Sequence, residues 1–384
     1  MSCSQIDSVP MLDLKRQYRL IGDQMDDALK NVNQTGQFIL GPEVAKLEEN
    51  IAQYSKVNYA VGCASGSDAL LLSIMAAKVG PGDEVIVPSF TFFASASCIA
   101  RLGATIKLVD ISHDSFCLDP QSVQANISER TKAIIAVHLF GQAADMVAIQ
   151  EIVKDAEKKY GHKIYVIEDS AQAIGAELNG VSVGNWGDLS CLSFYPTKNL
   201  GGAGDGGMVL GNNKELVDYV KLLRGHGMAP RYYHKVIGIN SRLDSYQAAI
   251  LNVKLPYLDQ WIASRQEVSA RYSKLFTDAK LTDKIVLPIA LPNRRHVWHQ
   301  YVIRVLDGKR NDLRAFLAQK KIGSDIYYPL GVHQQECFAY LGYKPQDLPE
   351  TLKAANEVLA LPIFPELTYE EQIYLVKTVA EFFA

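Results

Sequence analysis

Short apolar runs alternate with helical periodicity between about residues 43 and 225, and this alternation limits the fold more than any other feature. In residues 43–56 apolar side chains recur at helical spacing, as on one face of a helix. Residues 84–87 form a short apolar run that Pro88 ends, which is typical of a buried strand. Strands and helices in this order predict a mainly parallel sheet covered by helices on both faces. The same patterns predict helices at 67–78, 92–102 and 146–159 and strands at 106–109, 133–137, 163–167, 189–194 and 207–210.

The pattern changes after about residue 240. A largely helical stretch runs over residues 243–276, with Pro256 as an expected kink. Beyond it we expect a smaller α+β region, with strands at 300–305 and 324–328 and helices at 312–321, 352–359 and 369–382. We therefore predict a large domain with an N-terminal arm at residues 1–250 and a small C-terminal domain at residues 251–384.

Composition excludes several classes of function. The 39 Lys and Arg residues against 42 Asp and Glu residues leave a net charge of −3, too weak an imbalance for a general nucleic-acid-binding protein. The most apolar stretch, residues 90–102, is interrupted by serines and is too short to span a bilayer. Residues 1–10 have neither the basic start nor the apolar centre of an export signal. We therefore expect a cytoplasmic protein with no nucleic-acid or membrane partner.

Cysteine usage agrees with that location. The six cysteines are scattered and form no CxxC pair; they are Cys3, Cys63, Cys98, Cys117, Cys191 and Cys337. In a chain of this size such a pattern predicts reduced thiols in the core rather than disulfides or a zinc site, and we expect no bound metal.

A lysine followed by a glycine-rich loop forms the segment SCLSFYPTKNLGGAGDGG, residues 190–207. Lys198 follows a predicted strand, and five glycines crowd behind it. Such a density of glycine means that the backbone adopts positive φ angles or approaches another group closely. The loop matches neither GxxxxGK[ST] nor a GxGxxG that opens a helix, so a tight structural turn stays open as an alternative.

Two acidic residues lie at the predicted end of another strand. In YVIEDSAQAIG, residues 165–175, an apolar run leads directly into Glu168 and Asp169. The carboxyl ends of parallel strands are where open α/β sheets bind ligands. The alternative for Asp169 is a cap on the following helix.

A helix start and a group of aromatic residues complete the set. In CASGSDALL, residues 63–71, Ser67 and Asp68 lie in the first turn of a helix, whose free N–H groups suit a phosphate. A plain serine cap is the alternative. In PSFTFFA, residues 88–94, Phe92 follows a strand end, where it is either a core residue or a contact to a cofactor.

These four parts together match the needs of pyridoxal 5′-phosphate (PLP). A lysine links covalently to this cofactor, and an acid near the pyridine nitrogen keeps that nitrogen protonated so that the ring can act as an electron sink. An aromatic side chain stacks on the ring, and a helix start receives the phosphate.

The sequence resembles the DegT/StrS family of sugar-nucleotide aminotransferases nearly from end to end. The motifs that carry the resemblance are GQFILGPEV (36–44), GSDAL (66–70), GDEVIVPSFTF (82–92), EDSAQAIGA (168–176), SFYPTKNLGGAGDGG (193–207) and NSRLD (240–244). The resemblance implies the aspartate-aminotransferase fold (fold type I), in which a large, mainly parallel α/β domain binds PLP and a smaller C-terminal α+β domain follows.

Individual residues take roles from this resemblance. Lys198 resembles the catalytic lysine that binds PLP and then moves protons, Asp169 the acid at the pyridine nitrogen, and Gln172 the contact on the ring hydroxyl side. Asn240 corresponds to a phosphate contact that the family supplies from the partner subunit, which implies a homodimer with shared active sites. The other implied cofactor contacts are Gly66, Ser67, Asp68, Phe92 and Ser193.

The resemblance assigns the substrate side less specifically. Glu168 is expected to support Asp169 from behind, and His226 and His234 lie in a loop that is expected to approach the site. Arg242 is either a structural residue or a substrate contact. The residues that resemble the family's substrate-side positions are Phe38, Tyr327, Tyr328 and His333.

The implied reaction is transamination of a nucleotide-diphospho-keto-hexose, with glutamate as the amino donor, in surface-polysaccharide or amino-sugar biosynthesis. Sugar 3-dehydratases of the same fold carry histidine at the lysine position, so Lys198 favours transamination over dehydration. One alternative is a fold-type-I PLP enzyme that acts on an amino acid, with Arg295, Arg304 or Arg314 as a carboxylate clamp. Another is a PLP-binding regulatory protein without turnover.

Overall fold

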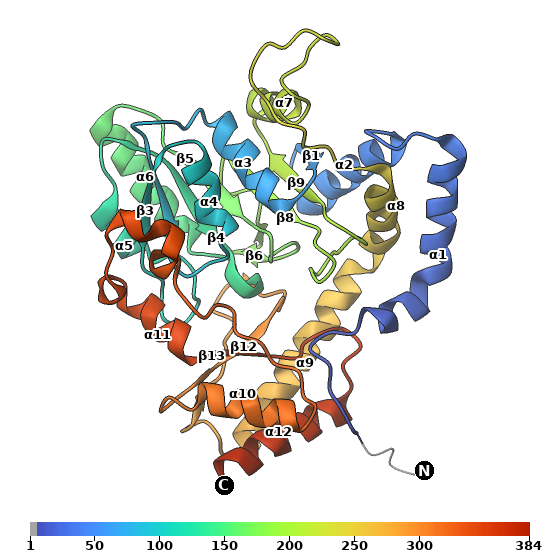
Figure 1. The fold of residues 1–384 in the computed structure, drawn as a ribbon, viewed down its shortest axis with the longest axis vertical. Helices are drawn as coiled ribbons and strands as arrows, with labels where there is room; N and C mark the ends of the chain where they lie inside the picture. Colours follow the sequence, from blue (N-terminus) through green and yellow to red (C-terminus); the bar gives the residue numbers. More distant parts are fainter. Residues whose placement is uncertain (1–5) are drawn as a thin grey trace.

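A seven-stranded sheet forms the centre of the computed structural model, which describes residues 6–384 (Figure 1). Its strand order is β1-β9-β8-β5-β4-β2-β3. Only β9 runs against its neighbours, because it pairs antiparallel with both β1 and β8 while the other pairs are parallel. The predicted α/β class with a mainly parallel sheet is thereby confirmed. The strands are β1 (Tyr59–Cys63), β2 (Glu84–Pro88), β3 (Thr105–Val109), β4 (Thr131–Val137), β5 (Tyr165–Asp169), β8 (Leu189–Ser193) and β9 (Gly207–Gly211).

Helices between these strands bury the sheet. For example, α3 packs against β8 and β9, while α4 packs against β2 and β3 and α7 against β1 and β9. The sheet strands are therefore almost wholly apolar and buried, as parallel strands covered by helices require. The helices of this part are α2 (Pro42–Ser55), α3 (Gly66–Ala76), α4 (Ala94–Arg101), α5 (Pro120–Asn126), α6 (Met146–Tyr160), α7 (Lys214–Leu223) and α8 (Ser245–Lys254).

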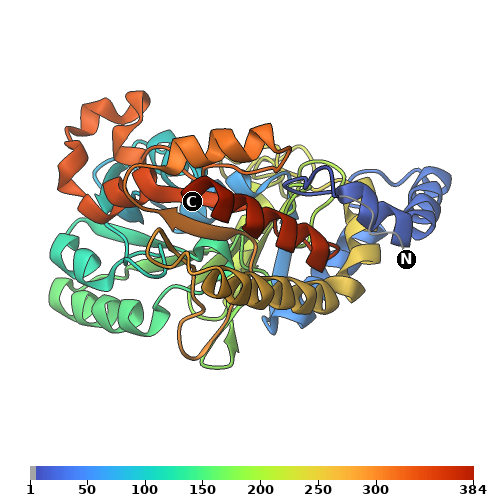
Figure 2. The same ribbon diagram turned by 90° about the horizontal axis from the view of Figure 1, so that it is seen from below.

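A second apolar core lies around a three-stranded antiparallel sheet with the order β10-β12-β13. Its largest side chains include Tyr272, Tyr301 and Phe276, and Val9 from the N-terminal segment packs into it as well. Figure 2 shows the long α9 and the C-terminal α12, which pack against each other on this core. The elements are α9 (Leu258–Asp278), β10 (Ile285–Val286), β12 (Tyr301–Val305), α10 (Arg310–Gln319), α11 (Pro349–Glu357), β13 (Val358–Leu361) and α12 (Tyr369–Phe383).

A third, small sheet joins distant parts of the chain. It has the order β11-β6-β7, so that β11 (Arg294–Arg295) pairs with β6 (Glu177–Leu178), which pairs with β7 (Val181–Ser182). The short 3₁₀ segments are η1 (Leu139–Gly141), η2 (Leu255–Tyr257), η3 (Val332–Gln334), η4 (Glu336–Leu341) and η5 (Pro345–Asp347).

The N-terminal helix α1 (Leu14–Thr35) was not expected from the sequence and stands out from the body of the molecule (Figure 1). Asp13 caps its start by accepting a hydrogen bond from the Lys15 N–H, and Gly36 ends it in a left-handed conformation. The helix packs against α8 and leaves Tyr18 and Leu20 half or more exposed.

Two expectations for the C-terminal half were wrong. Residues 324–328 form no strand; Asp325 alone bridges Ala360, which leaves this stretch free to line a cavity. The helix expected at 352–359 ends at Glu357, and the chain continues directly as β13. At Pro256 the expected kink is a full 3₁₀ turn that separates α8 from α9, because proline cannot donate the helical hydrogen bond. The domain boundary at residue 250 stays a prediction.

The structure bears on two earlier expectations, that the cysteines are core thiols and that no segment spans a membrane. Cys63, Cys98, Cys117 and Cys191 are buried free thiols, whereas Cys337 is exposed and so is not the core residue that was expected. Cys3 lies outside the described residues. Within residues 6–384 no helix combines the length and apolar character needed to cross a bilayer.

Candidate active site

One cavity of about 540 Å³ opens at the carboxyl ends of the parallel strands. His138 follows β4, Asp169 ends β5 and Ser193 ends β8, and all three line this cavity. Ligands of open α/β sheets bind at this edge. Nine of the residues singled out in the sequence line the cavity together: Gly66, Ser67, Phe92, Asp169, Gln172, Ser193, Lys198, Tyr327 and Tyr328.

Asp169 is a nearly buried carboxylate with a defined set of donors. Its Oδ2 accepts a hydrogen bond from Ser95 Oγ at 2.7 Å, and its Oδ1 accepts one from the Ala171 N–H at 3.2 Å. Thr91 Oγ1 lies 3.1 Å from Ser95 Oγ and extends the network. These bonds fix the carboxylate at the end of β5, where it faces the cavity.

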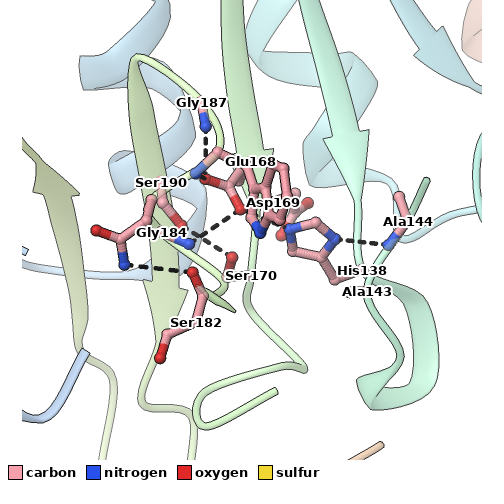
Figure 3. Close-up of polar contacts among 12 residues, drawn as sticks. His138, Ala143, Ala144, Glu168, Asp169, Ser170, Ser182, Gly184, Gly187 and Ser190 are labelled. Carbon is pink, nitrogen blue, oxygen red and sulfur yellow. Dashed lines mark hydrogen bonds and ion pairs between the residues drawn. The ribbon is translucent and has the colours of Figure 1, made fainter. Parts of the chain in front are cut away.

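Glu168 lies behind Asp169 and is fully buried (Figure 3). Its carboxylate accepts three backbone hydrogen bonds, from Gly184, Trp186 and Gly187, at 2.8–3.0 Å. His138 Nε2 lies 2.9 Å from the carboxylate, and His138 Nδ1 accepts from the Ala144 N–H at 3.0 Å. Because Nδ1 accepts, Nε2 carries the proton that is donated to Glu168. Glu168 therefore holds the strand end and the 184–187 turn together.

The start of α3 forms one end of the cavity. Ser65 caps the helix by accepting from the Asp68 N–H at 3.1 Å, so the side chain of Ser67 stays free and exposed. Gly66 lies so close to Ser193 that a Cβ there would come within 2.6 Å of the Ser193 Cβ. A helix N-terminus flanked by two hydroxyl groups suits a phosphate.

The glycines behind Lys198 serve close packing rather than positive φ. None of the five has a φ in the left-handed region. A side chain at Gly207 would overlap the Ser65 carbonyl, and one at Gly202 would come within 2.8 Å of Gln247. Helix α8 holds the loop from behind, because Gln247 accepts from the Ala203 N–H at 2.8 Å and Lys254 donates to the Gly201 carbonyl at 2.8 Å. Of the two conditions that the glycine density allowed, close approach applies, and the group approached is the protein itself.

Lys198 is half-buried, on a turn between β8 and the glycine loop. Burial lowers the pKa of its amine to about 8, while the nearby Asp169 carboxylate acts in the opposite direction. An amine whose pKa lies near physiological pH can hold and release a proton there, as a general acid and base must.

Aromatic and amide groups form the remaining walls. Gln172 Oε1 accepts from the Phe140 N–H at 2.7 Å, and its Nε2 donates to Tyr328 OH at 3.3 Å. Phe92 is 56% exposed and lies 6.2 Å from the Tyr328 ring, centroid to centroid. A large aromatic side chain this exposed at a cavity has a free face for stacking.

Five predicted site residues do not line the cavity of their own chain. Asp68 lies in the first turn of α3, and Asn240 accepts from Arg242 Nε at 2.9 Å on the exposed stretch after α7. Phe38 stacks on Tyr246 with ring centroids 5.7 Å apart. His333 is buried, with Nδ1 2.7 Å from Ser89 Oγ and Nε2 3.2 Å from the Pro345 carbonyl oxygen.

The two loop histidines do not line it either. His226 and His234 are exposed, and the His226 carbonyl lies 2.9 Å from His234 Nδ1. They lie in the loop that projects beyond α7 at the top of Figure 1.

Sequence reasoning missed several residues of the cavity wall. Thr91 stands within the PSFTF motif and lines the cavity, whereas Ser95, four positions later, does not line it but bonds to Asp169; this helical spacing is the one signal that could have found them. His299 and Gln300 come from a segment some 100 positions beyond Lys198 and gave no signal. The other polar residues of the wall that were missed are Ser65, His138, Tyr195, Thr197 and Asp205.

The cavity fits PLP in each part. A helix N-terminus with Ser67 and Ser193 suits the phosphate, Asp169 suits a protonated ring nitrogen, and Phe92 suits the ring face. Lys198 supplies the amine for the covalent link. A volume of about 540 Å³ is in the range of pockets for small molecules and cofactors. Fold and cavity together define the class of PLP-dependent enzymes of fold type I.

Comparison with known proteins gives the family. The DegT/DnrJ/EryC1/StrS aminotransferase family matches residues 20–380. A pleiotropic regulatory protein of Geobacillus stearothermophilus is 50% identical over 376 residues, which cover 98% of this chain and 99% of that protein. A UDP-N-acetyl-3-dehydro-α-D-glucosamine 3-aminotransferase of Acidithiobacillus ferrooxidans is 42% identical over 376 residues, 98% of each chain.

A solved structure agrees with this result. The crystal structure of S. venezuelae DesV in complex with a ketimine intermediate superposes with a TM-score of 0.92 at 37% identity, and the match covers 98% of this chain and 99% of that one. The chain belongs to the DegT/DnrJ/EryC1/StrS aminotransferase family. The predicted family, fold class and enzyme class are confirmed, and the cofactor of this aminotransferase is PLP.

Proposed function

We propose that this aminotransferase transfers an amino group from glutamate to the C3 keto carbon of a nucleotide-diphospho-hexose, in the biosynthesis of an amino sugar, including those of surface polysaccharides. The observation that carries the proposal is that Lys198 and Asp169 face one cavity whose wall carries hydroxyl and amide groups but, within residues 6–384, no arginine. Such groups suit a sugar ring. The name of the Acidithiobacillus relative, a 3-aminotransferase of a UDP-linked 3-dehydro sugar, supports C3.

The side chains divide the chemistry among themselves. PLP, when bound, supplies an electron sink for the charge that develops at the carbon next to nitrogen. Lys198 Nζ takes the proton from that carbon and returns it on the other side of the nitrogen, in each of two half-reactions. Asp169 holds a proton at the ring nitrogen. Gln172, Tyr327 and Tyr328 line the cavity and would orient the sugar and limit the access of water to it.

The three arginines considered as carboxylate clamps for an amino-acid substrate do not serve the cavity. The three candidate carboxylate clamps are all engaged elsewhere: Arg295 pairs with Asp259 at 2.8 Å, Arg304 with Glu357 at 2.9 Å, and Arg314 with Asp325 at 3.4 Å. None of the three arginines lines the cavity in the described part of the chain. Among the residues that the structure describes, the wall that one chain supplies therefore holds no arginine clamp of its own, and the carboxylates of the glutamate donor would have to meet groups of the partner chain.

A regulatory role without turnover is the second candidate, because the Geobacillus relative carries a regulatory name. The presence of Lys198, Asp169 and Gln172 in one cavity favours turnover.

The experiment incubates the holoenzyme with glutamate and with UDP-, dTDP- and GDP-linked 3-keto and 4-keto hexoses. The proposal predicts continuous release of 2-oxoglutarate, beyond one equivalent per active site, only when a 3-keto sugar nucleotide is present, with an amino sugar as the product. Turnover with 2-oxo acids but with no sugar would support the amino-acid enzyme. Absence of turnover with every donor and acceptor would support the regulatory role.

We also propose a homodimer in which each chain completes the site of the other. Asn240 does not line its own cavity. Large apolar side chains are exposed on α1, on the loop between α1 and α2 and on the loop between α7 and α8: Leu20 by 69%, Ile39 by 55%, Tyr232 by 75% and Ile237 by 92%. Exposed apolar surface of this kind is typical of an interface. The basic residues Arg231, Lys235 and Arg242 lie on the same loop and would bring positive charge toward a diphosphate of the partner's substrate.

Mixing two inactive variants tests the shared site. In a dimer formed from Lys198→Ala and Asn240→Asp chains, one site keeps both native residues. Random re-association should restore about a quarter of wild-type activity. Sites formed within one chain would give no recovery, and a monomer in solution would contradict the proposal outright.

For the location we propose the cytoplasm, which the four buried free thiols support.

A further inference from the structure

His299 forms part of the cavity wall with Lys198, but the reaction described above gives it no role. Its exposed fraction is 5%, and it lies in segment 296–300, just before β12. This segment docks closely onto η1, where the Val297 N–H donates to the Gly141 carbonyl at 2.9 Å. A Cβ at Gly141, whose φ is +101°, would come within 2.9 Å of the His299 backbone nitrogen. The docking brings a side chain of the C-terminal half to the lysine of the large sheet.

Asn199, the residue next to Lys198, fixes the orientation of the His299 ring. Its Nδ2 donates to the Val297 carbonyl at 2.9 Å, so its Oδ1 is the atom that lies 3.1 Å from His299 Nδ1. Because Oδ1 only accepts hydrogen bonds, His299 Nδ1 carries the proton and donates it. The other ring nitrogen, Nε2, has no hydrogen-bond partner among residues 6–384.

The groups around the ring keep it neutral. Burial, reinforced by the positive charges of Lys198 and Arg265, lowers the pKa of His299 well below its ordinary value of 6.5. Arg265 reaches the segment from α9 and donates to the carbonyls of His299 at 3.4 Å and Ile363 at 2.8 Å. Two carboxylates line the same cavity, Asp169 and Asp205, and the charge of Asp169 acts on Lys198. His299 is therefore a neutral imidazole whose Nε2 carries a lone pair.

We propose that His299 is a positioning residue for the catalytic lysine, whose amine donates a hydrogen bond to the unprotonated His299 Nε2 whenever that amine is free. Between the two half-reactions the amino group resides on the cofactor, and the Lys198 amine must stay within reach of the reacting carbon. A neutral acceptor holds the amine there without a positive charge that would repel it. The proposal rests on the proposed role of Lys198 as acid and base but not on the identity of the sugar.

The test uses the holoenzyme in its pyridoxamine phosphate form, in which the Lys198 amine is free. Its pKa is measured from the pH dependence of labelling by an amine-specific reagent, read by mass spectrometry of the Lys198 peptide. Loss of an acceptor disfavours the charged amine, so His299→Phe should lower this pKa by roughly one unit. His299→Gln places an amide oxygen near the position of Nε2 and should restore the wild-type value.

His296→Gln is the matched control. His296 is a buried histidine of the same segment whose pKa burial lowers to about 3, but it stacks on Trp298 and does not line the cavity. This variant should leave the pKa of Lys198 unchanged. A folded His299→Phe protein with an unchanged Lys198 pKa would overturn the proposal, as would a shift of equal size in His296→Gln.

A second measurement keeps the proposal testable if His299→Phe does not fold. Nitrogen-15 NMR of the histidine rings in the unsubstituted holoenzyme should show His299, assigned by its absence from His299→Gln, as the neutral Nδ1–H tautomer at neutral pH. A proton on Nε2 would overturn the proposal. Neither readout needs the sugar substrate, so a failure to aminate any sugar nucleotide would count against the proposed function alone.

Discussion

Ser95 Oγ donates a hydrogen bond of 2.7 Å to Asp169 Oδ2, and both groups are buried. Ser95 lies in α4 and Asp169 at the end of β5, so the bond joins two elements that are 74 residues apart in the chain. It orients the carboxylate that we assign to the ring nitrogen of PLP.

The substitution Ser95→Ala should therefore weaken the site without removing any group that touches the cofactor. A hydrogen bond to a charged group contributes roughly 1.5–3 kcal/mol, so kcat and PLP affinity should fall about tenfold or more. Ser97→Ala is the control, because Ser97 Oγ on the same helix faces only the Ala94 carbonyl, at 3.5 Å. Equal losses in both variants would mean that the effect comes from the helix and not from Asp169.

Gly207→Ala should destabilise the fold and the phosphate end of the site together. The added Cβ would overlap the Ser65 carbonyl at the start of α3, and neither backbone segment can move without disturbing the sheet. Overpacking of this kind costs roughly 1–3 kcal/mol in the free energy of unfolding. Urea denaturation measures the loss, and Gly80→Ala, which has nothing within 4 Å of its Cβ, should show little change. Normal stability and PLP affinity in Gly207→Ala would contradict the close packing.

Features of the site that depend on local sequence were predicted, whereas contacts between residues far apart in the chain were not. Asp169 and Lys198 were located because both follow short apolar strands, and the parallel sheet brings such strand ends to one edge. The glycine cluster was recognised and close approach was one of its two explanations, but the groups approached were not identified, because Ser65 and Gln247 come from elements far away in the chain.

Ser95 and His299 were missed for the same reason. Ser95 and His299 act through partners some 70 to 100 positions away, and no local periodicity reports such a pair. Helix α1 was missed for another reason: its apolar residues do recur at helical spacing, at Leu14, Tyr18, Ile21, Met25 and Val32, so the signal was present in the sequence and was not read.

Glu168→Gln should cost stability because it disrupts a fully satisfied buried carboxylate. The amide NH₂ would face backbone N–H donors that now point at Glu168 oxygens (Figure 3). We expect a loss of about 3 kcal/mol in the free energy of unfolding, since breaking a buried charged network typically costs that much. Chemical denaturation measures this loss, with Glu129→Gln as the control because Glu129 is exposed. A loss below the error of the control would contradict the structural role of Glu168.

Lys254 makes stability depend on pH at the alkaline end. Burial lowers the pKa of this amine from 10.5 to about 8 in the folded protein. Between these values the unfolded chain binds the proton more tightly, so the free energy of unfolding rises with pH through this window. The gain should be roughly 3 kcal/mol relative to Lys254→Met, in which the titrating amine is absent. Parallel pH profiles for the two proteins would show that the amine stays charged in the fold.

The most direct test of the account is the identity of the residue that binds the cofactor. We predict that borohydride reduction of the yellow holoenzyme fixes PLP to a single peptide, the one that contains Lys198, and that Lys198→Ala retains no covalent cofactor after the same treatment. Covalent PLP in the Lys198→Ala protein, or reduction onto another lysine in the wild-type protein, would contradict the central assignment.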